Sequence, residues 1–427
     1  MIDVAQPESV GLSTSRLSSI DDWMQHQVDR EKLPGLSVLI HRRDRAAFFG
    51  TTGMMDREAG KPVTEDTIFR IYSMTKPITS VAVMMLYEEG RFQLDDPIAK
   101  YIPELDNMKV MTGKDITSPK LEPAREPITI RQLLTHTAGL TYGFMMSTPV
   151  DAMYREYQVD FATANPEATP GDLVRRLGEI PLLCQPGSEW NYSVATDVLG
   201  HFVEVVSGET LAEFFQERIL GPLGMTDTAF SVPADKLDRF AAMYGPEHGG
   251  SLSDVNASRD PTEIRHEPPG GLKLLDPPAE SRFAKPLRLY SGGGGLTSTI
   301  VDYLRFCRML AGGGELDGER LLGRKTVDFM TRNHLPGDLA AMGQPRFSES
   351  SYDGIGFGLG FSVMLDPTKA QVMGTPGEYA WGGAASTAFW VDPAEEMIVI
   401  MMTQLMPSST YGIRRELRVL SYQALID

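Results

Sequence analysis

The chain has 427 residues, of which 42% are hydrophobic and 23% charged, an ordinary globular composition that permits one large domain or two intertwined ones. Its net charge is −17 and its isoelectric point about 4.9, so it lacks the excess of lysine and arginine with which proteins neutralise nucleic-acid phosphates. No apolar run reaches the roughly 18 residues of a spanning helix. We therefore expect neither a nucleic-acid nor a membrane partner.

The N-terminal sequence MIDVAQPESVGL lacks the basic start and the apolar core of a signal peptide, so a cytoplasmic location is expected. Two cysteines, Cys184 and Cys307, are too few for a disulfide framework. Each stands in an apolar run, and we therefore expect reduced thiols that pack as small hydrophobic side chains.

The first predicted elements are a helix and a hairpin. The spacing of apolar residues predicts a helix over 13–30, whose start Ser13 or Ser15 can cap. Two strands are predicted at 36–41 and 46–50, and the charged turn between them makes the pair a hairpin.

A buried helix over 75–89 follows, and Ser73 and Lys76 stand at its start. Residues at i and i+3 share one helix face, so these two side chains are expected to point the same way. A serine hydroxyl is a poor nucleophile until a base takes its proton, and a lysine can be that base only if burial or a neighbouring cation lowers its pKa. S-x-x-K is the spacing of penicillin-recognising serine enzymes, although about one such match is expected by chance in a chain of this length.

The middle of the chain is predicted to be mostly helical, with long connections. A turn-rich exit covers 94–103, an exposed loop 107–127, and a Met-rich stretch without clear periodicity 143–153. The segment 240–286 is dense in proline and glycine, and we expect it to fold over one rim of the site. Helices are predicted at 130–134, 172–177, 194–206 and 211–219.

Strands return in the last third of the chain, after the glycine run SGGGG at 291–295. They are predicted at 356–365, 387–391 and 397–404, with helices at 300–311, 325–331 and 411–426.

Because strands occur at both ends, the simplest architecture is an α/β (α+β) fold whose antiparallel sheet is built from both ends and flanked by helices. Residues 1–80 and 288–427 would form this α/β lobe, and 81–287 a mostly helical lobe. The cleft between the lobes is the expected site.

Three stretches could meet in that cleft: Ser73-x-x-Lys76, the turn 186–194 with Tyr192, and the glycine turn at 381–384. Ser73 would attack a carbonyl carbon while Lys76 and Tyr192 share its proton, since a phenol needs a close cation to act as a base at neutral pH. Backbone N–H groups of the glycine turn and of Ser73 itself would stabilise the oxyanion.

Each of these features also has a plain structural interpretation. Tyr192 could be a core tyrosine with a satisfied hydroxyl, and Trp381-Gly-Gly could be a hairpin corner. SGGGG lacks the Lys-Ser/Thr that completes a phosphate loop. His136, in the stretch HTAGL, is expected to support the Ser73 region rather than to catalyse. The histidines have no metal-binding spacing, so neither a metal nor a cofactor is expected, and no G-x-S-x-G elbow occurs.

Five motifs follow one another along the chain: SMTK at 73–76, LLTHTAGL at 133–140, P-G-x-x-x-x-Y-S at 186–193, SGGGGLTST at 291–299 and WGG at 381–383. With them the chain resembles a family VIII carboxylesterase, a family similar to class C β-lactamases and serine D-Ala-D-Ala peptidases. The resemblance implies a β-lactamase/transpeptidase-like fold. It also implies Ser73 as nucleophile, Lys76 and Tyr192 as the base pair, Trp381, Gly382 and Gly383 along the substrate cleft, and the Ala384 N–H in the oxyanion hole.

Two departures from the β-lactamases and peptidases bear on the substrate. Trp381 stands where their K-T-G motif has a lysine that meets a substrate carboxylate. Tyr192-Ser-Val194 replaces Tyr-x-Asn, so the amide that could hold an acylamino side chain is missing. Both changes favour neutral, apolar esters over carboxylate-bearing lactams.

We therefore expect a serine carboxylesterase for small-molecule esters with short to medium acyl chains, with cephalosporins as slow secondary substrates. Met145 and Met146 of the Met-rich stretch, together with the segment 240–286, are expected to line the acyl pocket. Two alternatives stay open: a class C-like β-lactamase or D-amino acid peptidase or amidase, and a non-catalytic scaffold or binding protein on the same fold. The natural ester and the oligomeric state are left open.

Overall fold

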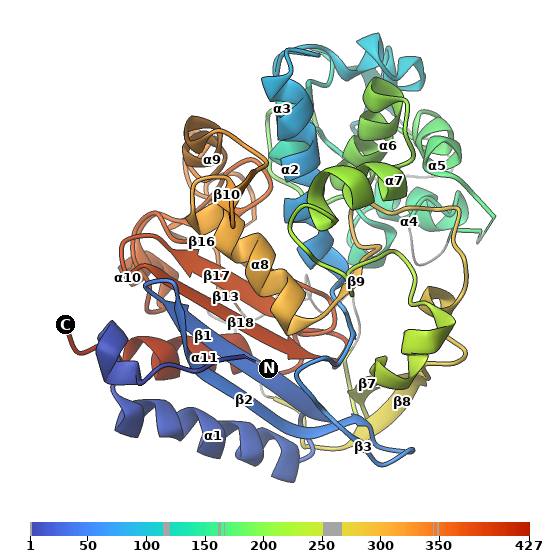
Figure 1. Cartoon of the computed structure of the whole chain (residues 1–427). Helices are drawn as coiled ribbons and strands as arrows, with labels where there is room; N and C mark the ends of the chain where they lie inside the picture. The colour runs from blue at the N-terminus through green and yellow to red at the C-terminus, as the bar shows by residue number, and fades with distance from the viewer. Residues whose placement is uncertain are drawn as a thin grey trace.

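The computed structural model describes residues 2–113, 120–160, 164–165, 167–250, 267–344, 346–347 and 350–427. Its centre is an eight-stranded antiparallel sheet with the strand order β14-β15-β16-β17-β18-β1-β2-β3 (Figure 1). The strands are β1 (Gly35–Arg42), β2 (Arg45–Asp56), β3 (Lys61–Pro62), β14 (Ile355–Phe357), β15 (Ser362–Met364), β16 (Tyr379–Gly382), β17 (Ala388–Asp392) and β18 (Met397–Thr403).

The two ends of the chain meet in the middle of this sheet. β1 pairs with β18 so that Leu39 lies opposite Ile400, and β2 pairs with the other edge of β1. Every residue of β1 and β18 is buried, because helices cover both faces of the sheet. The prediction of an antiparallel sheet built from both ends is confirmed.

The helices α1 (Thr14–Asp29) and α11 (Ile413–Tyr422) lie together on one face, and α8 (Ile300–Ala311) lies on the other (Figure 1). The start of α1 differs in detail from the prediction. The hydroxyls of Ser13 and Ser15 contact each other at 3.1 Å instead of capping the helix. Glu8 caps the start of α1 instead, because its carboxylate accepts hydrogen bonds from the Thr14 N–H and the Thr14 hydroxyl, both at 2.8 Å.

A second, mostly helical part is packed around α2 (Thr75–Glu88), which lies against α6 (Ala195–Ser207). Every residue of α2 from Thr75 to Leu86 is buried, including the polar Thr75, Lys76, Thr79 and Ser80. Four shorter helices begin with a threonine capping box, which fixes their starts locally. They are α3 (Ile130–Leu134), α4 (Pro149–Glu156), α5 (Pro170–Leu177) and α7 (Leu211–Phe215).

Short elements complete the described fold. The two-stranded pairs are β4 (Phe69–Arg70) with β9 (Thr297–Ser298), β5 (Lys109–Met111) with β6 (Leu121–Pro123), β7 (Met243–Pro246) with β8 (Leu272–Asp276), β10 (Glu315–Leu316) with β11 (Glu319–Arg320), and β12 (Arg346–Phe347) with β13 (Ser350–Ser351). The remaining helices are α9 (Arg324–Met330), α10 (Pro367–Ala370), the π-helix η6 (Gln216–Leu220), and the 3-10 helices η1 (Pro7–Val10), η2 (Tyr72–Met74), η3 (Ile98–Lys100), η4 (Pro103–Leu105), η5 (Gly143–Met145), η7 (Ala234–Arg239) and η9 (Arg282–Ala284).

Several predicted connections are more ordered than their composition indicates. The loop expected at 107–127 carries the pair β5–β6, and the stretch 143–153 contains η5 and most of α4. The strand predicted at 356–365 is two strands, β14 and β15, joined by a turn at Gly360. Gly360 has φ +96°, and a Cβ there would lie 2.1 Å from the Ser80 hydroxyl, so this turn requires glycine.

The segment 240–286 is not a single irregular loop. Its described residues form the pair β7–β8 and the short helix η9, and Phe283 of η9 is buried. Residues 251–266 lie outside the described residues, so this part of the prediction concerns a stretch that the structure does not describe.

One hydrophobic core runs from the inner face of the sheet through α8 and α2 into the helical part. A second, smaller core lies between the sheet and α1 with α11. The lobe boundaries predicted at 80 and 287 stay a prediction. Cys184 and Cys307 are free and buried, as predicted. Among the described residues, we find no helix with both the length and the apolar character needed to cross a membrane.

Candidate active site

Ser73 stands at a sharp turn that opens into a cavity of the described structure. It lies in η2, directly before α2, and the preceding Tyr72 has φ +41°, a left-handed conformation that costs about 1–3 kcal/mol at a non-glycine residue. The cavity has a volume of about 410 Å³, within the usual range for small-molecule sites. Ser73 lines it together with Tyr142, Tyr192, Trp381 and Ala384.

Lys76 is held by three acceptors. Its Nζ donates to the Gly293 carbonyl at 2.6 Å, to the Tyr142 hydroxyl at 3.0 Å and to Ser73 Oγ at 3.2 Å. An ammonium group has three N–H donors, so this geometry satisfies all of them. The side chain is only 2% exposed, and the three acceptors therefore compensate for the loss of water around a buried cation.

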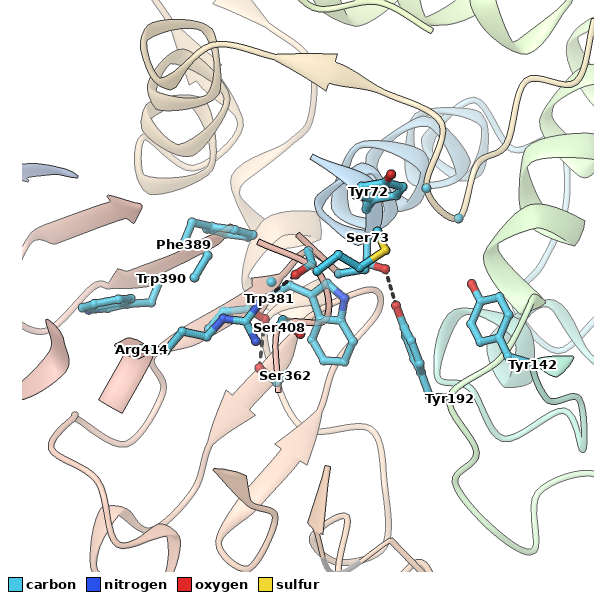
Figure 2. Close-up of a pocket in the computed structure, with 18 of the residues that line it drawn as sticks. Tyr72, Ser73, Tyr142, Tyr192, Ser362, Trp381, Phe389, Trp390, Ser408 and Arg414 are labelled. Atoms are coloured by element: carbon cyan, nitrogen blue, oxygen red, sulfur yellow. Dashed lines mark hydrogen bonds between the residues drawn. The ribbon is translucent and has the colours of Figure 1, made fainter. Parts of the chain in front are cut away.

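Tyr192 contacts the same hydroxyl from the other side. Its OH donates to Ser73 Oγ at 2.5 Å, and the two groups point at each other in Figure 2. Lys76 Nζ lies 4.6 Å from the centre of the Tyr192 ring, so the cation also faces the aromatic ring. The structure thus brings together the three side chains that the sequence singled out, although they come from two distant segments.

His136 packs against Tyr192 and the residue that follows it. Its Nδ1 lies 3.0 Å from the Ser193 hydroxyl, and its ring packs on the rings of Tyr192 and Trp190. The His136 carbonyl also accepts the Asn191 N–H at 2.9 Å. Burial, and then the charge of Lys76, lowers the pKa of His136 well below its ordinary value, so the ring is neutral at neutral pH. This is the supporting position that the sequence predicted.

Trp381 and Gly382 belong to the end of β16 rather than to a turn, which corrects the prediction; the turn begins at Gly383. The Trp381 ring packs on the Tyr192 ring, with the ring centres 5.6 Å apart. A Cβ on Gly383 would lie 2.4 Å from the Ile71 carbonyl oxygen, so only glycine lets this turn approach the segment before Ser73.

Arg414, at the start of α11, fixes the Gly383 turn. Its guanidinium donates to the Gly383 carbonyl at 2.8 Å and to the Thr387 carbonyl at 2.9 Å. The Gly383 N–H donates to the same Thr387 carbonyl at 2.9 Å. Ala384 follows this turn and lines the same cavity as Ser73, so its backbone N–H could meet a developing oxyanion.

Comparison with known proteins gives the family. The family model described as Beta-lactamase matches residues 20–424. The chain belongs to the β-lactamase family. The protein Rv1367c from Mycobacterium tuberculosis is 36% identical over 89% of this chain and 88% of its own length, and Esterase EstB from Burkholderia gladioli is 32% identical over 93% of each.

Solved structures agree with this result. EstCE1, described as a hydrolase with promiscuous acyltransferase activity, matches with a TM-score of 0.76 at 27% identity and covers 97% of this chain and 99% of its own. The resemblance to β-lactamase-like esterases and the β-lactamase/transpeptidase-like fold are thereby confirmed.

The structure adds three groups to the site of this β-lactamase family member that the sequence analysis did not single out. They are Tyr142, Asp197 and the backbone of Gly293. The run SGGGG was weighed as a phosphate loop and used as a family motif, whereas a run of glycines also indicates a close approach of backbone to another group. Tyr142 gave no separate signal, because its contact with Lys76 joins two distant segments.

The predicted acyl-pocket methionines require a correction. Met145 is buried in the hydrophobic core, and Met146 is 61% exposed with φ +51°. Phe144, between Tyr142 and these methionines, lies on the cavity wall, with its ring stacked on Tyr142 at 4.7 Å. From the segment 240–286, Phe283 reaches the cavity wall.

Proposed function

We propose that this protein is a serine carboxylesterase that hydrolyses neutral esters with short to medium acyl chains through an acyl-enzyme on Ser73. The observation that carries the proposal is that Ser73 Oγ receives hydrogen bonds from both Tyr192 (2.5 Å) and Lys76 (3.2 Å) inside a largely apolar cavity. Lys76 and Tyr192 together form the candidate base: once the pair has lost one proton, it can take the proton of Ser73, which is the requirement for an activated nucleophile.

In the proposed reaction, Ser73 Oγ attacks the ester carbonyl carbon while its proton passes to the Lys76/Tyr192 pair. The backbone N–H groups of Ser73 and Ala384 stabilise the oxyanion of the tetrahedral intermediate. The pair then gives the proton to the leaving alkoxide, which departs as an alcohol. Water attacks the acyl-enzyme with the same pair as base, which releases the acid and restores Ser73.

The cavity wall supports the choice of neutral esters. The Trp381 ring occupies the end of β16, where the penicillin-recognising relatives carry a lysine for a substrate carboxylate, and Phe144 and Phe389 line the same cavity. Val194 follows Tyr192 and is buried, so it offers no amide to an acylamino group. The similarity to Esterase EstB agrees with ester hydrolysis. Cephalosporins are proposed as slow secondary substrates.

Acyl transfer to an alcohol is the second candidate, because EstCE1 is described as a hydrolase with promiscuous acyltransferase activity. An acyl-enzyme in a largely apolar cavity partitions between water and an alcohol according to which of them binds. Adding an alcohol acceptor to the ester assay separates the two activities, since transfer yields a new ester in place of the free acid.

The test is hydrolysis of a p-nitrophenyl ester series, acetate to octanoate, beside the cephalosporin nitrocefin. Ser73→Ala should abolish ester turnover, and a fluorophosphonate should label Ser73 in the parent. Ser362→Ala is the matched control, because Ser362 lines the same cavity but donates to the Ala380 carbonyl at 2.9 Å. The Ser362→Ala variant should keep most of the ester-hydrolysing activity of the parent.

Nitrocefin turnover that rivals the best ester would replace the proposal by a β-lactamase with an unusual carboxylate site. Failure of both substrates, with Ser73 still labelled, would favour a peptidase or amidase. An unlabelled Ser73 in folded protein would favour a non-catalytic scaffold.

A further inference from the structure

Asp197 is a buried carboxylate of the active cavity to which the proposed reaction gives no role. It stands in the first turn of α6, five positions after Tyr192, and lines the cavity that holds Ser73. Its Oδ1 accepts the Ser291 hydroxyl at 2.5 Å and the Gly293 N–H at 3.1 Å. An acid at this place in a helix usually caps its own first turn, whereas this one is turned toward the glycine run.

The peptide units of Gly293 connect Asp197 to Lys76. The Gly293 N–H donates to Asp197, and the Gly293 carbonyl accepts Lys76 Nζ at 2.6 Å. The fit excludes a side chain at this point, since a Cβ on Gly293 would lie 2.4 Å from Asp197 Oδ2. A Cβ on Gly292 would lie 2.6 Å from the Thr196 carbonyl oxygen. These glycines therefore let the loop press against the start of α6.

Several buried titratable groups surround the Asp197 carboxylate and affect its pKa. Burial raises the pKa of Asp197, while Lys76 and the hydrogen bonds from Ser291 and Gly293 act against that rise. Tyr142 faces both Asp197 and Lys76. Asp160 is a second acid near Asp197, and burial raises its pKa to about 7.

Two more titratable groups complete these surroundings. The Tyr192 ring centre lies 4.6 Å from Lys76 Nζ, and the neutral His136 ring also interacts electrostatically with Lys76. The cation Arg155 acts on Asp160, whereas Lys76 is the cation that acts on Asp197. Asp197 is therefore the acid placed to balance the charge of Lys76.

We propose that Asp197 is a positioning residue of the esterase site, which holds the Gly293 carbonyl on Lys76 and supplies the negative charge that keeps Lys76 an ammonium beside Ser73. The inference rests on the proposed function. It explains why a run of glycines, a serine and an acid from two distant segments converge behind the S-x-x-K lysine. A buried anion favours the protonated form of its neighbours. Without the negative charge of Asp197, the Lys76/Tyr192 pair should therefore lose its shared proton at lower pH.

The test compares Asp197→Asn with Ser291→Ala in the pH dependence of kcat/KM for p-nitrophenyl butyrate. Asp197→Asn keeps the shape of the side chain but removes its charge. We expect kcat to fall about 10-fold to 100-fold. The acid limb of the kcat/KM profile should move to lower pH by at least about half a pH unit. Ser291→Ala keeps the charge and removes one hydrogen bond, so kcat should fall while the acid limb stays in place.

An Asp197→Asn profile that matches the parent profile after scaling would overturn the proposal, since a purely structural role lowers the rate without moving the limb. If Asp197→Asn does not fold, Asp197→Glu serves instead. It keeps the charge, so a lowered kcat with an unmoved limb is expected, and a moved limb overturns the inference.

The inference can fail separately from the proposed function. Absence of ester turnover in the parent would overturn the esterase proposal alone. The pH at which Lys76 loses its proton, followed by NMR of lysine-labelled protein, then tests Asp197 directly. Loss at lower pH in Asp197→Asn supports the inference, and an unchanged titration overturns it.

Discussion

At the scale of single residues, the role of each polar side chain in the site depends on whether it contacts the Ser73 hydroxyl directly. Ser73 accepts from both Lys76 and Tyr192, whereas Tyr142 contacts Lys76 and not the serine side chain in the described hydrogen bonds. A group that touches the reacting atom moves its proton in the transition state, and a group one step away only orients its neighbour. The two tyrosines therefore form a natural pair for comparison.

Tyr192→Phe and Tyr142→Phe should differ strongly in their effect on ester hydrolysis. Removing the Tyr192 hydroxyl takes away a proton carrier, so kcat/KM should fall about 10²-fold to 10⁴-fold. Removing the Tyr142 hydroxyl leaves the Ser73 contacts in place, and a loss of about 10-fold or less is expected. Steady-state kinetics with p-nitrophenyl butyrate decides, and equal losses in the two variants would contradict the assignment of Tyr192 to the reacting proton.

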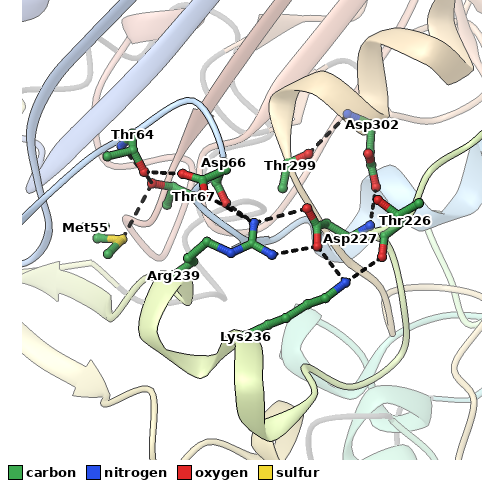
Figure 3. Close-up of polar contacts among 10 residues, drawn as sticks. All are labelled: Met55, Thr64, Asp66, Thr67, Thr226, Asp227, Lys236, Arg239, Thr299 and Asp302. Carbon is green, nitrogen blue, oxygen red and sulfur yellow. Dashed lines mark hydrogen bonds and ion pairs between the residues drawn. The ribbon is translucent and has the colours of Figure 1, made fainter. Parts of the chain in front are cut away.

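At the scale of elements, an ionic cluster joins η7, the segment before β4 and the start of α8 (Figure 3). The Asp227 carboxylate lies 2.7 Å from both Arg239 and Lys236, and Arg239 donates to the Asp66 carbonyl at 2.8 Å. The Asp227 N–H donates to Asp302 of α8 at 2.8 Å. β4 leads directly into the Ser73 turn, so the cluster fixes the approach of that turn to the rest of the fold.

Asp227→Asn should lower the free energy of unfolding by about 1–3 kcal/mol at pH 7, because hydrogen bonds to a charged group are lost. Arg239, through its hydrogen bonds, lowers the pKa of Asp227. The stabilisation is therefore complete above the ordinary aspartate pKa of about 4 and is lost as the pH falls through the lowered value.

Urea unfolding at intervals from pH 7 to pH 3 measures this difference. The gap between parent and variant should be constant near neutrality and shrink at the acid end. Asp235→Asn, at an exposed aspartate of η7, is the control and should change stability by less than about 0.5 kcal/mol. A gap that widens on acidification would contradict the role given to Asp227.

At the scale of the whole molecule, one hydrophobic core connects the sheet with the helical part. It includes Phe389 and Ile400 of the sheet, Ile78 of α2 and Phe202 of α6. A core that both parts share cannot be opened in one part without exposing apolar surface of the other. The lobes are therefore expected to unfold together, although chains of this length often unfold in steps.

Calorimetry should show a single unfolding transition, with a van't Hoff enthalpy close to the calorimetric enthalpy. The tryptophans offer a second probe, because Trp23 and Trp390 belong to the core beneath α1 and α11 while Trp190 and Trp381 belong to the shared core. Fluorescence and far-UV circular dichroism should give the same midpoint. Two resolved transitions would show that the parts fold independently.

The sequence by itself determined the features that depend on local periodicity and on the order of motifs. Ser73 and Lys76 fall on one face because i and i+3 neighbours do so in any helix, and the sheet was predictable from strands that alternate with helices at both ends. Tyr192 and Trp381 were found because their motifs stand in a fixed order along the chain.

Only the tertiary structure decided the contacts between distant segments. Tyr142, Asp197 and Gly293 reach Lys76 through packing of α2, α6 and the glycine run, which no local pattern encodes. The backbone course of η5 decided that Phe144 faces the cavity while Met145 and Met146 do not line it. Side-chain composition says which residues can fill a pocket, but the direction of each side chain is fixed by backbone dihedral angles that long-range packing selects.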